Sequence, residues 1–198
     1  MAAQYNRKDH LYTRAKSEGL RSRATYKIEE INKKHSLFNP NSLVLDLGSW
    51  PGGWLQYISS LLGKNGKAVG IDLVAIDSLD DPRIMLLRGD VRDEGLMEEA
   101  RKFVGGKFTS VISDMSPKLT GIKEADQAAS VGLAELALHV AKLYLQDGGN
   151  FVCKVFKGPD TDEFVKSARL VFKKVVRSEL DSTRSTSNEF YIIGLGLK

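Results

Sequence analysis

Several features of secreted and membrane proteins are missing from this sequence of 198 residues. Its single cysteine, Cys153, cannot form an internal disulfide. No apolar stretch is long enough to span a bilayer, and the polar N-terminus MAAQYNRKDHLYTRAK lacks the apolar core of a signal peptide. We therefore expect a cytoplasmic protein that makes no use of a membrane.

Internal repeats and low-complexity tracts are also missing. The composition, 42% hydrophobic and 27% charged, is ordinary for a globular protein. A chain of this length can bury one sizeable core, so a single folded domain is expected.

Positive charge is concentrated at one end of the chain. Residues 1–36 contain nine Lys and Arg against four Asp and Glu, whereas the remaining residues contain 20 against 21. A basic arm on a near-neutral domain is typical of a protein that binds a polyanion, although a solvated tail has the same composition. We assign residues 1–21 to a basic arm and residues 22–198 to one domain. The candidate phosphate contacts are Arg7, Lys8, Arg14, Lys16, Arg21 and Arg23.

Short apolar runs alternate with helical patterns along most of the chain. This alternation predicts parallel β-α-β units in a doubly wound sheet with helices on both faces. The five runs are residues 43–47, 67–72, 84–90, 108–114 and 151–156. Two further runs, KKVVRSEL and NEFYIIGLGL, are joined by a linker too short for a crossover helix. They should form an antiparallel hairpin at the end of a mostly parallel, seven-stranded sheet.

A helix is expected in front of the first strand, over residues 22–36. Ser22 or Thr25 is the candidate cap. Ala24, Ile28 and Ile31 recur at helical spacing and should form its packing face.

Aspartates stand at or just beyond the ends of four successive predicted strands. They are Asp46, Asp72, Asp90 and Asp114. In a doubly wound sheet, ligands bind at the carboxyl ends of the strands. One such aspartate is an ordinary turn residue, but four around a glycine-rich loop indicate a ligand site.

The glycine-rich loop reads DLGSWPGGW, residues 46–54. Its glycines allow a ligand to approach the main chain closely. The dinucleotide fingerprint G-x-G-x-x-G and the lysine of a P-loop are both absent, which disfavours a pyrophosphate ligand. Asp46 places an anion beside the loop and favours a cationic ligand such as S-adenosyl-L-methionine. Asp72 is then placed to hold the ribose hydroxyls, and Asp90 to accept a hydrogen bond from the adenine amine.

The stretch NFVCKVFKG places Lys154 in the middle of an apolar strand. Burial of an unpaired charge costs on the order of several kcal/mol, so this lysine needs a partner or a cleft. The alternative is an edge strand, from which a lysine side chain reaches water.

Five motifs occur in an order that resembles the FtsJ (RrmJ) family. The motifs are RATYKIEEI, DLGSWPGGW, SDMSP, FVCKVFKG and STRSTSNEFYIIGLG. The resemblance extends over nearly the whole chain from about residue 7. It implies a Rossmann-like methyltransferase fold and an enzyme that transfers a methyl group from S-adenosyl-L-methionine to a ribose 2′-hydroxyl of ribosomal RNA.

The resemblance also implies site residues. The catalytic tetrad falls on Lys27, Asp114, Lys154 and Glu189, the cofactor contacts fall on Gly48, Gly52, Trp54, Asp72, Asp90 and Asp114, and no metal is expected. Each residue has a simpler explanation when taken singly, such as a solvated Lys27, a surface Glu189 or a core Trp54. Two positions depart from the family pattern, because Trp50 replaces a small residue and Ser116 replaces an alanine.

The implied substrate is a uridine in the A-loop of the 23S RNA of the large ribosomal subunit, methylated by a monomeric enzyme. Lys157, Lys118 and Lys123 are expected near the catalytic mouth. The role of Lys154 stays open between removal of the hydroxyl proton and orientation of the hydroxyl by a cation. Three alternatives stay open as well: a tRNA or mRNA-cap substrate, a non-catalytic RNA-binding module of the same fold, and a nicotinamide oxidoreductase.

Overall fold

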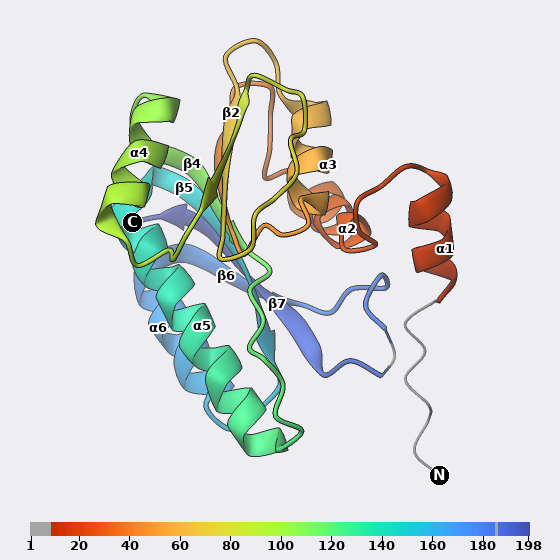
Figure 1. Cartoon of the computed structure of the whole chain (residues 1–198). Helices are drawn as coiled ribbons and strands as arrows, with labels where there is room; N and C mark the ends of the chain where they lie inside the picture. Colours follow the sequence, from red (N-terminus) through yellow and green to blue (C-terminus); the bar gives the residue numbers. More distant parts are fainter. Residues whose placement is uncertain (1–8, 185) are drawn as a thin grey trace.

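One seven-stranded sheet organises the protein, in the order β3-β2-β1-β4-β5-β7-β6 (Figure 1). The computed structural model describes residues 9–184 and 186–198, so Arg7 and Lys8 of the predicted phosphate contacts lie outside the described residues. The strands are β1 (Leu43–Leu47), β2 (Lys67–Asp72), β3 (Ile84–Arg88), β4 (Phe108–Ser113), β5 (Leu145–Phe156), β6 (Phe172–Ser178) and β7 (Glu189–Leu197).

The first five strands are parallel, and β7 runs antiparallel to both of its neighbours, β5 and β6. This confirms the predicted sheet. The last strand does not simply extend the sheet beyond β6. It inserts between β5 and β6, which leaves β6 at the edge.

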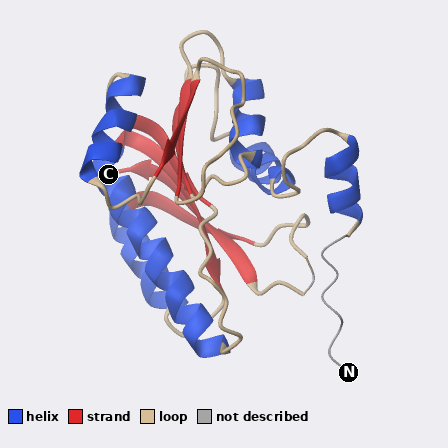
Figure 2. Ribbon diagram, in the orientation of Figure 1, coloured by secondary structure: helices blue, strands red, loops and turns tan. Residues whose placement is uncertain are grey.

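Helices cover both faces of the sheet, as Figures 1 and 2 show. The helices are α1 (His10–Ser17), α2 (Thr25–His35), α3 (Gly53–Leu61), α4 (Glu94–Val104), α5 (Lys123–Tyr144) and α6 (Thr161–Val171). Side chains of α2 and α3 form one apolar layer with the sheet, and those of α4, α5 and α6 form the other. None of the helices in the described ranges is long and apolar enough to cross a membrane.

The strand that carries Lys154 is internal. β5 pairs with β4 on one side and with β7 on the other, so the edge-strand explanation of Lys154 is wrong. Successive side chains of a strand point to opposite faces. Val152 packs in the α2–α3 layer, whereas Phe151 and Cys153 pack in the opposite layer, so Lys154 emerges on the α2 side.

The helix predicted over residues 22–36 is α2, Thr25–His35, and its buried Ile28 and Ile31 confirm the packing face. The predicted caps are wrong. The N-cap is Ala24, which makes no side-chain capping bond. The two hydroxyls are used in the preceding turn, where Ala24 N donates to Ser22 Oγ at 2.9 Å and Thr25 Oγ1 donates to Ser22 O at 2.8 Å.

A carboxylate on α2 holds the loop between β6 and β7. Glu30 accepts hydrogen bonds from the backbone N–H groups of Asp181 and Ser182, both at 3.0 Å, and from the Ser182 hydroxyl at 2.8 Å. This tether joins the beginning of the domain to its end. It places the start of β7, Glu189, against the first turn of α2.

Candidate active site

Two cavities open at the carboxyl edge of the sheet, and Ser116 lines both of them. The first, which we call the strand-end cavity, has a volume of about 640 Å³, and its acidic and glycine lining residues are Gly48, Asp72, Gly89, Asp90, Asp114 and Gly132. The second, which we call the α2–β7 cavity, has a volume of about 380 Å³, and its charged lining residues are Arg23, Lys27, Lys123, Asp126, Arg184 and Glu189. Four of the six predicted cofactor residues therefore line the strand-end cavity, and two of the four predicted catalytic residues, Lys27 and Glu189, line the adjoining α2–β7 cavity.

The glycine loop shapes the floor of the strand-end cavity. Gly48 has φ +78°, and a Cβ atom there would lie 2.6 Å from Met115 Cγ and 3.1 Å from Met115 Cα. No side chain fits at this position. Asp72 fixes the loop from the next strand, because its carboxylate accepts from Trp50 N at 2.9 Å and from Val74 N at 2.8 Å.

Asp90 lies on the opposite wall and pairs with Arg92. The Arg92 Nε atom donates to Asp90 Oδ1 at 2.9 Å, and this hydrogen bonding lowers the pKa of Asp90 to about 2. The carboxylate is thus ionised at neutral pH and available as an acceptor.

Asp46 is buried under the loop, with 1% of its surface exposed. Neither carboxylate oxygen accepts a hydrogen bond from the described residues, because the neighbouring Ser49 hydroxyl donates to the Asp46 backbone carbonyl instead. Burial raises the pKa of Asp46 well above its usual value; the Ser49 hydroxyl beside it lowers this pKa, and the nearby carboxylates of Asp114 and Asp72 raise it further. An unpartnered buried carboxylate is costly, and it marks the place for a donor that the protein alone does not supply.

Trp54 and Gly52 lie behind the strand-end cavity. The Trp54 ring is 3% exposed, donates its indole N–H to Ala24 O at 2.9 Å and packs 6.1 Å from the Tyr191 ring. It lines a small space of about 20 Å³ that it shares with Asp46. Gly52 has φ +102° and is the N-cap of α3. Both residues support the loop, and neither lines the strand-end cavity.

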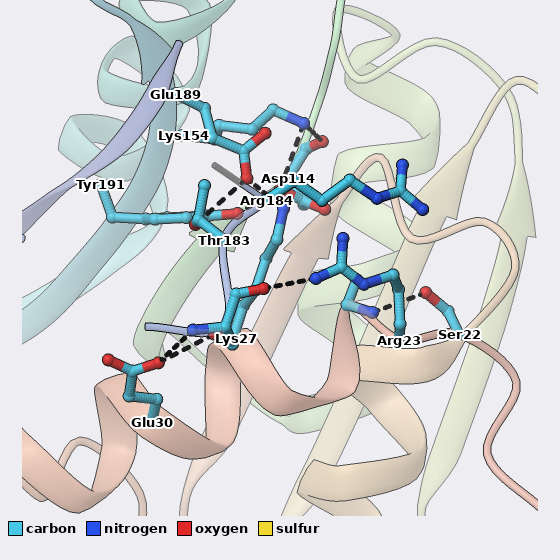
Figure 3. A network of polar contacts seen from close by, with 12 residues as sticks. Ser22, Arg23, Lys27, Glu30, Asp114, Lys154, Thr183, Arg184, Glu189 and Tyr191 are labelled. Atoms are coloured by element: carbon cyan, nitrogen blue, oxygen red, sulfur yellow. Dashed lines mark hydrogen bonds and ion pairs between the residues drawn. The ribbon is translucent and has the colours of Figure 1, made fainter. Parts of the chain in front are cut away.

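The four side chains of the predicted tetrad converge between the two cavities (Figure 3). The Lys154 Nζ atom donates to Asp114 O at 2.7 Å and lies 3.2 Å from Asp114 Oδ1. Lys27, from α2, forms an ion pair with Glu189 at the start of β7. Both lysines are buried, with 8% and 7% of the Lys27 and Lys154 surfaces exposed.

Tyr191 joins the two pairs. Its hydroxyl donates to Asp114 Oδ1 at 2.8 Å, and the Lys27 Nζ atom lies 5.7 Å from the centre of its ring. Burial raises the pKa of Asp114, but the charges of Lys154 and Lys27 and the Tyr191 hydrogen bond outweigh it, so the pKa of Asp114 lies below its usual value. Burial, with the charges of Asp114 and Glu189, raises the pKa of Tyr191 well above its usual value.

Sequence reasoning missed Tyr191 and Glu30 as parts of the site. A signal was available for Tyr191, since it stands two residues after Glu189 and thus on the same face of a strand. No such signal existed for Glu30, because its partners are more than 150 residues away in the chain.

The two positions expected to depart from the family pattern lie on the rim. Trp50 is 57% exposed beside the strand-end cavity, and Ser116 stands where the two cavities meet. Within the part of the chain that the structure describes, no group of three or more His, Cys, Asp and Glu side chains is arranged to hold a metal ion.

The basic residues proposed as phosphate contacts differ in their surroundings. Arg21 donates to the backbone carbonyls of Pro51, Asp77 and Ser78 and so ties the arm to the glycine loop. Lys157 pairs with Glu179 at 2.8 Å. Arg14 pairs with Glu18 at 2.7 Å, whereas Lys123 lines the α2–β7 cavity.

The sheet order, the inserted antiparallel last strand and the acidic strand ends around a glycine loop define a Rossmann-like methyltransferase fold. Many solved structures share it, among them the following two. A Plasmodium falciparum protein described as a ribosomal RNA methyltransferase matches with a TM-score of 0.78 and 24% identity, over 89% of this chain and 98% of its own. A Clostridium thermocellum protein described as an rRNA methylase matches with a TM-score of 0.55 and 16% identity, over 85% and 97%.

The family model described as FtsJ-like methyltransferase matches residues 20–197, and the chain belongs to that family. Proteins named ribosomal RNA large subunit methyltransferase E are similar over nearly the whole of this chain. The one from Marinobacter nauticus is 41% identical over 96% of this chain and 91% of its own, and the one from Bdellovibrio bacteriovorus is 40% identical over 98% and 99%. The resemblance read from the five motifs is confirmed.

Proposed function

We propose that this protein transfers a methyl group from S-adenosyl-L-methionine to a ribose 2′-hydroxyl of ribosomal RNA in the large subunit, with a uridine of the A-loop as the target. One observation carries the proposal. Asp114 lines the strand-end cavity and contacts Lys154, while Lys27 and Glu189 line the α2–β7 cavity. The tetrad is therefore the boundary between a place for a methyl donor and a place for an acceptor.

The strand-end cavity fits the donor. Asp72 and Asp90 are acceptors at the ends of adjacent strands, suited to ribose hydroxyls and to an adenine amine respectively. The unpartnered Asp46 carboxylate lines the small space that adjoins this cavity at Gly48, Trp50 and Asp114. It suits a cationic group, which S-adenosyl-L-methionine has both in its sulfonium and in its amino group. When bound, this cofactor supplies an electrophilic methyl group that needs no further activation.

The nucleophile is the difficult partner, because a ribose hydroxyl is barely ionised at neutral pH. Among the residues that the structure describes, Lys154 Nζ contacts two acceptors, both on Asp114, which leaves one tetrahedral position to meet the hydroxyl. In that position a neutral amine accepts the hydroxyl proton, whereas an ammonium group donates to the oxygen and directs a lone pair at the methyl group. Alignment of the two reactants can supply about 7–11 kcal/mol of the barrier in favourable cases.

The acceptor is proposed to be ribosomal RNA because the similar proteins carry that substrate in their names. The proposed location, the cytoplasm, and the monomeric state follow from this assignment to the ribosome-modifying members of the family. A tRNA or an mRNA cap is the alternative acceptor for the same site.

The test is incubation with isotopically labelled S-adenosyl-L-methionine and large ribosomal subunits that lack this methylation. We expect label on a single 2′-O-methyluridine, found by nuclease mapping and mass spectrometry of the nucleosides. Label on a base, or on tRNA in preference to the subunit, would contradict the proposal. Calorimetry provides the control for cofactor class, since S-adenosyl-L-methionine should bind and NAD should not.

A further inference from the structure

A carboxylate from the N-terminal segment holds two arginines at the rim of the α2–β7 cavity. Asp9 Oδ2 accepts from Arg184 Nε at 2.8 Å and lies 3.2 Å from an Nη atom of Arg23. The three side chains are mostly buried, with 23%, 20% and 14% of the Asp9, Arg184 and Arg23 side-chain surfaces exposed. We call this group the Asp9 clasp.

The two arginines come from opposite ends of the chain and face the same space as the tetrad. Arg23 precedes α2 and is held by its bond to Ser182 O at 2.6 Å, while Arg184 lies in the loop before β7. Both line the α2–β7 cavity together with Lys27 and Glu189. Figure 3 shows Arg23 and Arg184 beside the four tetrad side chains.

We propose that Arg23 and Arg184 form a phosphate-binding site for the RNA strand, and that Asp9 occupies this site until an RNA phosphodiester displaces it. The inference rests on the proposed function, because it places the acceptor strand in the α2–β7 cavity. Guanidinium groups bind carboxylate and phosphate oxygens with the same paired geometry. A phosphodiester carries the same single negative charge as Asp9, so the exchange leaves the charge of the cluster unchanged.

Asp9 can leave without loss of its helix. Its second oxygen, Oδ1, caps α1 by accepting from Tyr12 N at 2.8 Å, and that bond is independent of the arginines. The far end of α1 is held separately, because Glu18 accepts from the Tyr26 hydroxyl at 2.8 Å and the Arg14 guanidinium lies 4.9 Å from the Tyr26 ring centre. The start of α1 can therefore shift while its end stays attached.

The experiment compares RNA affinity in Asp9→Asn and the wild type, with an unmethylated transcript of the large-subunit RNA as the probe. Asparagine keeps the helix cap but removes the charge that competes with phosphate. Partly exposed ion pairs are weak, so we expect binding to tighten by about threefold to tenfold. Arg184→Gln should weaken binding and reduce the slope of log affinity against log salt by about one. When Arg184→Gln is already present, adding Asp9→Asn should increase the RNA affinity much less than it does in the wild type.

The matched control is Glu98→Gln on α4, which removes one negative charge from an exposed ion pair with Arg101. Binding by Asp9→Asn no tighter than by Glu98→Gln would overturn the inference, provided that circular dichroism melting shows all variants to be folded. Methyl transfer by the wild type is measured in parallel. If the wild type methylates normally but Asp9→Asn does not bind RNA more tightly, only the Asp9 clasp is rejected. If Asp9→Asn binds RNA more tightly but the wild type transfers no methyl group, only the proposed function is rejected.

Discussion

The two cavities that meet at the tetrad are built in opposite ways. The strand-end cavity takes its acidic residues from the ends of β2, β3 and β4 and its glycine loop from the end of β1, and these four strands lie side by side in the sheet. The α2–β7 cavity takes four of its six charged residues from the first and last parts of the domain, as the Lys27–Glu189 pair across 162 positions shows, and the other two from the start of α5.

The difference separates two kinds of sequence information. Parallel strands end at the same edge of a sheet, so local patterns alone assemble the first cavity. The second cavity exists only because β7 folds back beside β5 and because Glu30 ties the preceding loop to α2. Variants of the two cavities should therefore fail in different ways.

The largest effect is expected at the boundary between the cavities. Lys154→Met removes the group that meets the hydroxyl, and we expect methyl transfer to fall by about 10²–10⁴-fold, the range of a lost acid–base group. Affinity for S-adenosyl-L-methionine, measured by calorimetry, should stay close to that of the wild type. Lys157→Met is the matched control, since Lys157 is half-exposed and pairs with Glu179. Substantial turnover by Lys154→Met would remove this residue from the mechanism.

Gly48→Ala should weaken binding of the cofactor without altering the α2–β7 cavity. The added Cβ would lie 2.6 Å from Met115 Cγ, at a φ that disfavours any side chain. We expect affinity for the cofactor to fall by about 10- to 100-fold, which corresponds to about 1.4–2.8 kcal/mol. Gly106→Ala, where nothing lies within 4 Å of the added Cβ, is the control. Unchanged cofactor affinity would show that the loop is not the binding surface.

Asp46→Asn should raise the stability of the cofactor-free protein in a pH-dependent way. The pKa of Asp46 is raised by burial, so this group supports folding fully below its unfolded pKa and loses that support as pH rises through its folded pKa. Asparagine has no such charge. We expect the empty variant to be more stable than the wild type near pH 7, by about 1–3 kcal/mol, and the gap to close in acid. Denaturant unfolding across a pH series measures this, and a gap that does not change with pH would contradict it.

The smallest effect is expected from Tyr191→Phe. The ring and its packing against Trp54 stay, and only the hydrogen bond to Asp114 is lost. We expect a loss of about 0.5–1.5 kcal/mol in the free energy of unfolding. Tyr12→Phe, at an exposed ring, is the control and should be neutral in thermal melting. If Tyr191→Phe loses no more stability than Tyr12→Phe, the hydrogen bond from Tyr191 to Asp114 contributes nothing to the free energy of unfolding.

The same contrast explains how far the sequence could be read. The bounds of β1 and β2 agree with the predicted ranges because continuous apolar runs end at clear turn residues. The antiparallel pairing of β6 and β7 also followed from the short linker. The position of β7 between β5 and β6 could not be predicted in this way. A short linker indicates that the two strands it joins are neighbours, but it does not indicate which of them pairs with β5.

Within the site, local pattern placed Asp72, Asp90 and Asp114 at one edge of the sheet. Lys27 and Glu189 could be joined only through the family resemblance, since no local rule pairs a helix lysine with a strand glutamate so far along the chain. The structure brings the tetrad together, and the roles of its members stay predictions. The caps assigned to Ser22 and Thr25 failed because both hydroxyls have closer partners in the turn before α2.

The central claim is that one cavity holds the cofactor and the other holds the RNA. Calorimetric titration of S-adenosyl-L-methionine into the wild type, Asp72→Asn and Arg184→Gln tests it most directly. Asp72 lines the strand-end cavity and not the α2–β7 cavity. Arg184 lines the α2–β7 cavity and not the strand-end cavity. We predict that affinity falls in Asp72→Asn by about tenfold, the loss of one charged hydrogen-bond acceptor, and is unchanged in Arg184→Gln. An equal loss in both variants would contradict the division of the site.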